Sequence, residues 1–169
     1  MSGKKRVATG MNKDLLLQEI VARLSDNLEV LEKAALASHV EATHESSKAE
    51  SKYDTRGLEA AYLAGGQARQ AKEILDSIKL YRSLPMRAFT AKEPIDLTAL
   101  VKLAVDGLSS MYFLGPKSGG LEVEYNGEEI VVITPQSPLG QNLMGKMSGQ
   151  RWTATLGNST VKYQIVEVW

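Results

Sequence analysis

Two series of regularly spaced small and apolar residues, separated by a polar segment, constrain the fold of this chain most strongly. Members of each series lie three or four residues apart, which places them on one face of an α-helix and predicts lengthwise packing against another helix. The first series is Leu17, Ile20, Leu24, Leu28, Leu31, Ala35 and Ser38. The second series is Leu58, Ala61, Ala64, Ala68, Ala71, Leu75, Ile78 and Tyr81.

The segment between the two series, EATHESSKAESKYDTRG at residues 41–57, is polar and has no apolar face to bury. The simplest arrangement is an antiparallel hairpin with this segment at its tip. We expect helices over about 12–44 and 55–84, with Asn12 as the N-cap of the first helix. Arms of about 30 residues would be about 45 Å long, so the hairpin would project as a probe, a spacer or a dimerisation arm.

Residues after Pro85 differ in composition, because Gly, Pro, Val and Ile become frequent and turn signals separate short apolar runs. This pattern is typical of strands and turns. Strands are expected over 97–107, 111–115, 121–125, 128–134, 151–156 and 160–169. The pairs Asn126-Gly127 and Gly157-Asn158 predict turns between strands. Ser137 and Pro138 predict the N-cap and the first position of a short helix.

These signals together predict an α+β chain of three parts. Residues 1–84 would form a two-helix coiled-coil hairpin preceded by a disordered tail, residues 85–96 a linker, and residues 97–169 a small antiparallel β domain with one short helix. Gly65 and Gly66, inside the second helix, would allow the two helices to pack closely, or would mark a functional bend. Trp152 and Trp169 would anchor the core of the β domain.

Charge and residue usage exclude several classes of protein. The chain has 20 basic and 20 acidic residues and a formal net charge of zero, whereas a nonspecific DNA binder carries a basic excess that neutralises phosphates. The absence of cysteine excludes disulfides, thiol nucleophiles and cysteine-ligated zinc, and it is typical of the reducing cytosol. No apolar run approaches the roughly 20 residues that span a bilayer. We therefore expect a cytoplasmic protein without membrane contact.

The segment SPLGQNLMGKMSGQ, at residues 137–150, resembles the SPLG-x-AL-x-GK-x-x-GD signature in the C-terminal domain of bacterial Gre transcript-cleavage factors. MYFLGP, at residues 111–116, resembles that family's aromatic strand leading into Gly-Pro, and YQIVEVW, at residues 163–169, resembles its closing strand. AESKYDTRGLEAAYLAGGQARQAKEI, at residues 49–74, is similar to the descending arm of the Gre coiled coil. The resemblance spans roughly residues 10–169.

The resemblance implies an FKBP-like C-terminal domain that docks on the rim of the secondary channel of bacterial RNA polymerase. It implies a monomer whose hairpin enters the channel and meets the 3′ end of the nascent RNA through the polymerase, without binding DNA itself. The docking residues implied are Ser137, Pro138, Leu139, Gly140, Leu143, Gly145 and Lys146.

In cleaving members of the family, carboxylates at the hairpin tip help to hold a second Mg²⁺ at the active centre of the polymerase. Mg²⁺ prefers such hard oxygen ligands, and a second metal stabilises the attacking or leaving oxygen. Glu41, Glu45, Glu50 and Asp54 lie in or beside the tip of this chain, and Glu50, Glu45 and Asp54 are the candidates for this role. The chain would hold no metal stably by itself, and it would stimulate the nuclease activity of the polymerase without being an enzyme.

The tip departs from the family pattern D-x-x-E-N-A-E-Y. Aligning Glu50 with the family's Glu places Ser47 at the Asp position, and aligning Tyr53 with its Tyr loses both acids. A second departure is Gln150, where the family more often has an acid. The acid pair is incomplete in either alignment, so cleavage stimulation and a non-cleaving regulator that occupies the channel both stay open. A peptidyl-prolyl isomerase and a coiled-coil dimeriser are remoter alternatives.

Overall fold

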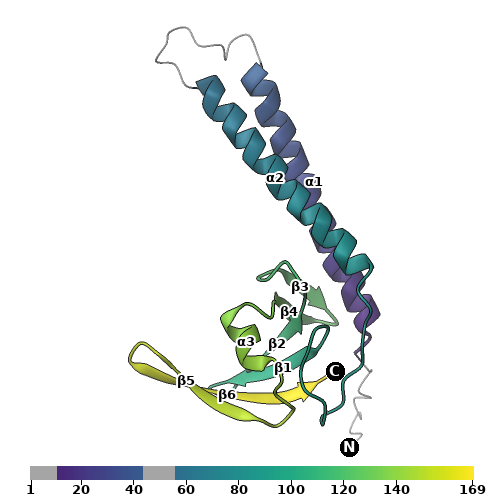
Figure 1. The fold of residues 1–169 in the computed structure, drawn as a ribbon, viewed down its shortest axis with the longest axis vertical. Coiled ribbons are helices and arrows are strands. Elements are labelled where there is room, and N and C mark those ends of the chain that lie inside the picture. The colour runs from purple at the N-terminus through teal and green to yellow at the C-terminus, as the bar shows by residue number, and fades with distance from the viewer. Residues whose placement is uncertain (1–10, 44–55) are drawn as a thin grey trace, which may run out of the picture.

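Helices α1 (Lys13–Thr43) and α2 (Arg56–Arg82) lie side by side and antiparallel, and together form the hairpin that the two apolar series predicted (Figure 1). The computed structural model describes residues 11–43 and 56–169. Asn12 caps α1 as predicted, because its Oδ1 accepts hydrogen bonds from the main-chain N–H groups of Asp14 (3.0 Å) and Leu15 (3.3 Å). Among the described residues, no helix combines the length and apolar character needed to cross a membrane.

The seam between the helices differs from the predicted series at several positions on α2. Leu75 is 40% exposed and Ala68 is also exposed, whereas Ile74 packs towards α1 and the sheet. The observed spacing of Ala71, Ile74, Ile78 and Tyr81 keeps one face of the helix inward, and Leu75 lies about 100° away from Ile74 around the helix axis. On α1, Leu16 is fully buried although the predicted series began one residue later.

Six strands form one sheet in the order β3-β4-β2-β1-β6-β5, with one short helix, α3, between β4 and β5. The strands are β1 (Leu100–Val105), β2 (Leu108–Leu114), β3 (Glu122–Tyr125), β4 (Glu128–Ile133), β5 (Arg151–Leu156) and β6 (Ser159–Val168), and α3 is Pro138–Leu143. A long helical hairpin followed by this sheet confirms the predicted α+β class.

The sheet is mixed, and so differs from the predicted antiparallel sheet at one pair, because β2 and β4 run parallel. After β2 the chain crosses to the outer edge, forms β3 and returns as β4 beside β2, which gives β4 the direction of β2. The return uses the predicted Asn126-Gly127 turn, whose φ angles of 54° and 75° are left-handed at both positions. A second two-residue turn, Asp106-Gly107, joins β1 to β2.

Each face of the sheet carries its own core. The base of the hairpin covers one face, where Leu16, Ile20, Leu24, Ile78 and Tyr81 pack against buried residues of the sheet. The other face is covered by α3 and by the coil between α2 and β1. The buried residues of this second core are Phe89, Ile95, Ala99, Val101, Leu103, Leu114, Ile133, Leu143, Ile165 and Val168. The predicted linker, 85–96, therefore contributes two buried side chains, Phe89 and Ile95, to the β domain.

Candidate functional site

The segment that resembles the Gre signature folds as α3 and the loop after it. Ser137 caps the helix in an extended conformation, with its Oγ accepting a hydrogen bond from the N–H of Gly140 (3.1 Å) and donating one to the main-chain oxygen of Thr134 (2.8 Å). Pro138 follows at the start of the helix, where its fixed φ suits the first turn and no N–H is required. Both predicted roles are confirmed.

Gly140 and Leu143 fix the helix to the sheet. A Cβ on Gly140 would overlap the main-chain oxygen of Thr134, so only glycine allows α3 to approach the end of β4 this closely. Leu143, on the same face of the helix, is fully buried in the second core. The exposed residues of α3 are Pro138, Gln141 and Asn142, which leaves a small polar face towards solvent.

Gly145 and Lys146 join this segment to the coil that follows α2. The N–H of Gly145 donates to the main-chain oxygen of Ile95 (2.8 Å). The N–H of Ile95 donates in turn to the main-chain oxygen of Lys146 (2.7 Å). Gly145 has a φ of 77°, a conformation that glycine adopts without strain. This reciprocal pair holds the end of the signature against a segment about 50 residues earlier, as two strands would be held.

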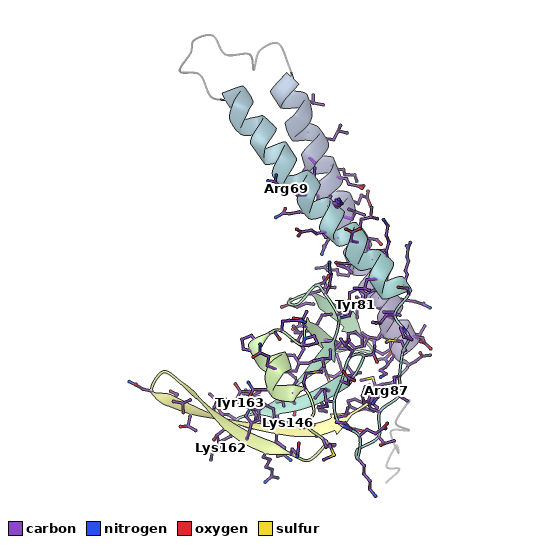
Figure 2. All side chains as sticks on the ribbon, viewed as in Figure 1. Arg69, Tyr81, Arg87, Lys146, Lys162 and Tyr163 are labelled. Carbon is purple, nitrogen blue, oxygen red and sulfur yellow. The ribbon has the colours of Figure 1, made fainter. Side chains whose placement is uncertain are left out.

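A cation and two aromatic rings stack beside α3. The Nζ of Lys146 lies 5.4 Å from the centroid of the Trp152 ring, and that ring stacks on Tyr163 with centroids 4.9 Å apart and planes at 6°. All three side chains are half-buried, and Figure 2 shows Lys146 and Tyr163 near each other beside β6. Trp152, the middle member of this stack, packs against the second core, as expected of an anchor.

Tyr163 was not predicted as a site residue, although the sequence contains a signal for its position. Trp152 and Tyr163 are opposite each other in the β5–β6 pair. They stand five residues before and five residues after the Gly157-Asn158 turn, which the sequence did predict. In an antiparallel hairpin, residues equidistant from a two-residue turn face each other, so the ring pair follows from the turn.

The three candidate tip carboxylates, Glu45, Glu50 and Asp54, lie outside the described residues, in the segment 44–55 between α1 and α2. Within residues 11–43 and 56–169, no group of three His, Asp or Glu side chains converges as a metal site would require.

An open groove of about 810 Å³ runs between the hairpin and the loop from Lys117 to Leu121. Its apolar lining comes from Leu24, Val30, Leu31, Ile74 and Leu121. None of the described residues along it is aromatic, whereas a prolyl-peptide site needs an apolar, aromatic-lined pocket.

Comparison with known proteins gives likeness in structure only. No family model matches the chain, and no curated protein matches it. Gfh1, GreA factor homolog 1 of Thermus thermophilus, is 19% identical over 88% of this chain and 94% of its own, with a TM-score of 0.35. Gfh1 of Thermus aquaticus is 23% identical over 87% of this chain and 92% of its own, also with a TM-score of 0.35.

The elongation factor GreA/GreB of Nitrosomonas europaea is 20% identical over 56% of this chain and 78% of its own chain, with a TM-score of 0.34. Identities below 25% and TM-scores below 0.5 assign no activity to the present chain.

Proposed function

We propose that this chain is a Gre-type transcription factor that binds bacterial RNA polymerase at its secondary channel. The observation that carries the proposal is the behaviour of the segment that resembles the family signature. Ser137 caps α3, Gly140 permits its contact with Thr134, Leu143 anchors it, and Gly145 pairs with Ile95. The residues that resemble the family signature therefore also have definite structural roles in α3 and the loop after it. We assign docking on the polymerase to this surface element.

The shape of the hairpin supports insertion into a channel. Beyond the sheet, α1 and α2 continue as a bare pair of helices (Figure 1). From Glu32 to Thr43 alone, α1 extends about 18 Å at 1.5 Å per residue. A two-helix hairpin is narrow and stiff, as a probe that reaches a buried active centre must be. The docking segment lies in the β domain, so docking and insertion are assigned to opposite parts of the molecule.

Two activities of such a factor are distinguished by the tip. If Glu50 and a neighbouring acid hold a second Mg²⁺, the factor stimulates the polymerase to cleave a backtracked transcript. If the acid pair is incomplete, as Ser47 in the position of the family's Asp suggests, the factor occupies the channel without cleavage. The described residues offer no other carboxylate cluster for a metal.

The direct experiment uses stalled, backtracked elongation complexes incubated with the protein and Mg²⁺. Shortened transcripts indicate cleavage stimulation. Unshortened transcripts, together with competition against a known cleavage factor, indicate the non-cleaving regulator. A protein that neither shortens transcripts nor competes is not a secondary-channel factor. A proline isomerisation assay on a short peptide and a sizing measurement test the isomerase and the dimeriser, respectively.

A further inference from the structure

Each helix of the hairpin reaches the β domain through one buried polar side chain, Lys13 from α1 and Tyr81 from α2. Lys13 is 9% exposed and Tyr81 is fully buried. Both lie at the base of the hairpin, and Figure 2 shows Tyr81 where α2 meets the sheet. Burying a polar group costs free energy unless it is hydrogen-bonded, so the partners of these two groups indicate what they do.

The ammonium of Lys13 joins three segments that are distant in the chain. It donates to the main-chain oxygens of Thr98 (2.8 Å), just before β1, and Trp169 (2.9 Å), after β6, and to that of Arg87 in the coil after α2. An ammonium has three N–H donors, so all of them are used. The ring of Phe89 lies 4.8 Å from Nζ and covers the group.

Tyr81 makes the corresponding contact from α2. Its hydroxyl donates to the main-chain oxygen of Lys117 (2.6 Å), in the loop that leaves β2. Gly115, in the same loop, leaves the space that the hydroxyl occupies, because a Cβ there would overlap it. Burial raises the pKa of Tyr81, so the hydroxyl keeps its proton as a hydrogen-bond donor.

We propose that Lys13 and Tyr81 are positioning residues that fix the direction of the hairpin relative to the sheet. The apolar contacts between the hairpin and the sheet are non-directional and tolerate sliding or rotation, whereas hydrogen bonds have a preferred distance and angle. One such attachment would leave a pivot. Two attachments, on different helices and to different loops, hold the hairpin and the sheet as one body.

The length of the hairpin makes its direction consequential. α1 has 31 residues, so it is about 46 Å long, and a rotation of about 10° at its base displaces its far end by about 8 Å. A displacement of about 1 Å can lower the rate of a reaction about 100-fold when the reacting groups must be aligned. The consequence for transcription rests on the proposed function, but the fixed direction does not.

The direction can be measured without polymerase, by distances between two spin labels. The chain has no cysteine, so Ala37→Cys on α1 and Glu128→Cys on β4, both exposed in the parent, place one label on each body. The parent should give one narrow distance distribution. Tyr81→Phe and Lys13→Met should broaden it or shift it by several ångströms.

Matched controls separate a loss of attachment from a general effect of substitution. Ser77→Ala removes a buried hydroxyl of α2 that donates only within its own helix, to the main-chain oxygen of Glu73. Lys33→Met removes an exposed lysine of α1. Both should keep the narrow distribution. Tyr81→Phe retains the ring in the core, and it decides the question even if Lys13→Met is too unstable to measure. Distributions as narrow in Tyr81→Phe as in the parent overturn the proposal.

A second measurement distinguishes failure of the positioning role of Lys13 and Tyr81 from failure of the proposed function. Tyr81→Phe should bind polymerase with the affinity of the parent, since the α3 segment is unchanged. Its activity on backtracked complexes, measured as transcript shortening or as inhibition of a known cleavage factor, should nevertheless fall at least tenfold at saturating concentration. A broadened distribution with no polymerase binding by either protein contradicts the proposed function and leaves the positioning role supported. A full effect at saturation with a broadened distribution contradicts the functional importance of the positioning role.

Discussion

Gly140 of α3 lies so close to the main-chain oxygen of Thr134 that the Cβ of any other residue would overlap that oxygen. Gly140→Ala must therefore push α3 away from the end of β4, with Leu143 moving in the second core. Overpacking of this kind costs typically about 1–3 kcal/mol, and we expect the upper part of that range because the obstacle is backbone. Denaturant unfolding measures the loss, and polymerase binding should weaken with it. A variant as stable as the parent would show that α3 adapts.

Gly65 and Gly66 provide the contrasting case. The sequence suggested that they allow close helix packing, but a Cβ on either would meet no atom within 4 Å. Glycine is therefore not needed for the approach of the two helices at either position, since Gly65 is exposed and Gly66, although half-buried, leaves room for a side chain. Each of Gly65→Ala and Gly66→Ala should stabilise the protein by up to about 1 kcal/mol through helix propensity. Thermal unfolding tests this, and a lowered midpoint would contradict the open space around them.

Lys13 predicts a pH dependence of stability. Burial, and then the nearby Arg87 guanidinium, lower its pKa to about 8 from the usual 10.5, with Asp14 opposing. Below pH 8 the lysine is protonated in both the folded and the unfolded chain, and its contribution is constant. Between about pH 8 and 10.5 the folded chain releases its proton first, so the free energy of unfolding rises with pH.

The size of this rise is at most about 3 kcal/mol, and the three carbonyl acceptors reduce it because they favour the charged form. Since other lysines and tyrosines also titrate in this window, the informative quantity is the difference between the parent and Lys13→Met. The parent and Lys33→Met should share the rise, and Lys13→Met should lack it. If the free energy of unfolding changed with pH in the same way in all three proteins, Lys13 would titrate like an exposed lysine.

At the tip, Glu50→Gln keeps the shape of the side chain and removes the charge that would attract Mg²⁺. If the parent stimulates cleavage, this variant should lose orders of magnitude in rate, because metal charge stabilisation is worth several kcal/mol and about 1.4 kcal/mol is tenfold. Binding should survive, so the variant should compete with the parent. Glu45→Gln and Asp54→Asn, measured beside it, should have smaller effects.

Two results would revise that assignment. Equal cleavage by the parent and Glu50→Gln would remove Glu50 from the metal site. Absence of cleavage by the parent at any Mg²⁺ concentration would favour the non-cleaving regulator, with Ser47 as the cause. Ser47→Asp would then show whether restoring the acid pair restores the activity.

Local chemistry was predictable from the sequence, and long-range hydrogen bonding was not. Asn12 and Ser137 cap their helices through bonds to neighbours two or three residues away, which a short window of sequence contains. The Asp106-Gly107 turn could have been predicted for the same reason, but the strand pattern was continued through it. Ile74 and Leu75 both fit a spacing of three and four residues between Ala71 and Ile78, so the repeat alone did not decide which of them faces α1.

Lys13 and Tyr81 had no comparable signal. The acceptors of Lys13 lie 74, 85 and 156 residues away in the chain, and that of Tyr81 lies 36 residues away. All are main-chain oxygens, which any residue type supplies, so no partner residue marks them in the sequence. The Trp152–Tyr163 pair is intermediate between local capping and long-range hydrogen bonding. It can be predicted only once the Gly157-Asn158 turn has been located.

The proposed function requires that the hairpin tip reach the active centre of RNA polymerase while the β domain stays outside the channel. The absence of cysteine allows a hydroxyl-radical-generating iron chelate to be attached at one chosen position, Ala49→Cys in the tip segment or Asn158→Cys in the β5–β6 turn. In complexes with polymerase, the chelate on the tip should cut the nascent RNA near its 3′ end. It should also cut the polymerase chains near the active centre of the polymerase. The chelate on the turn should cut only the outer surface. Cutting of the outer surface from both positions, or no cutting from either, would contradict insertion of the hairpin into the channel.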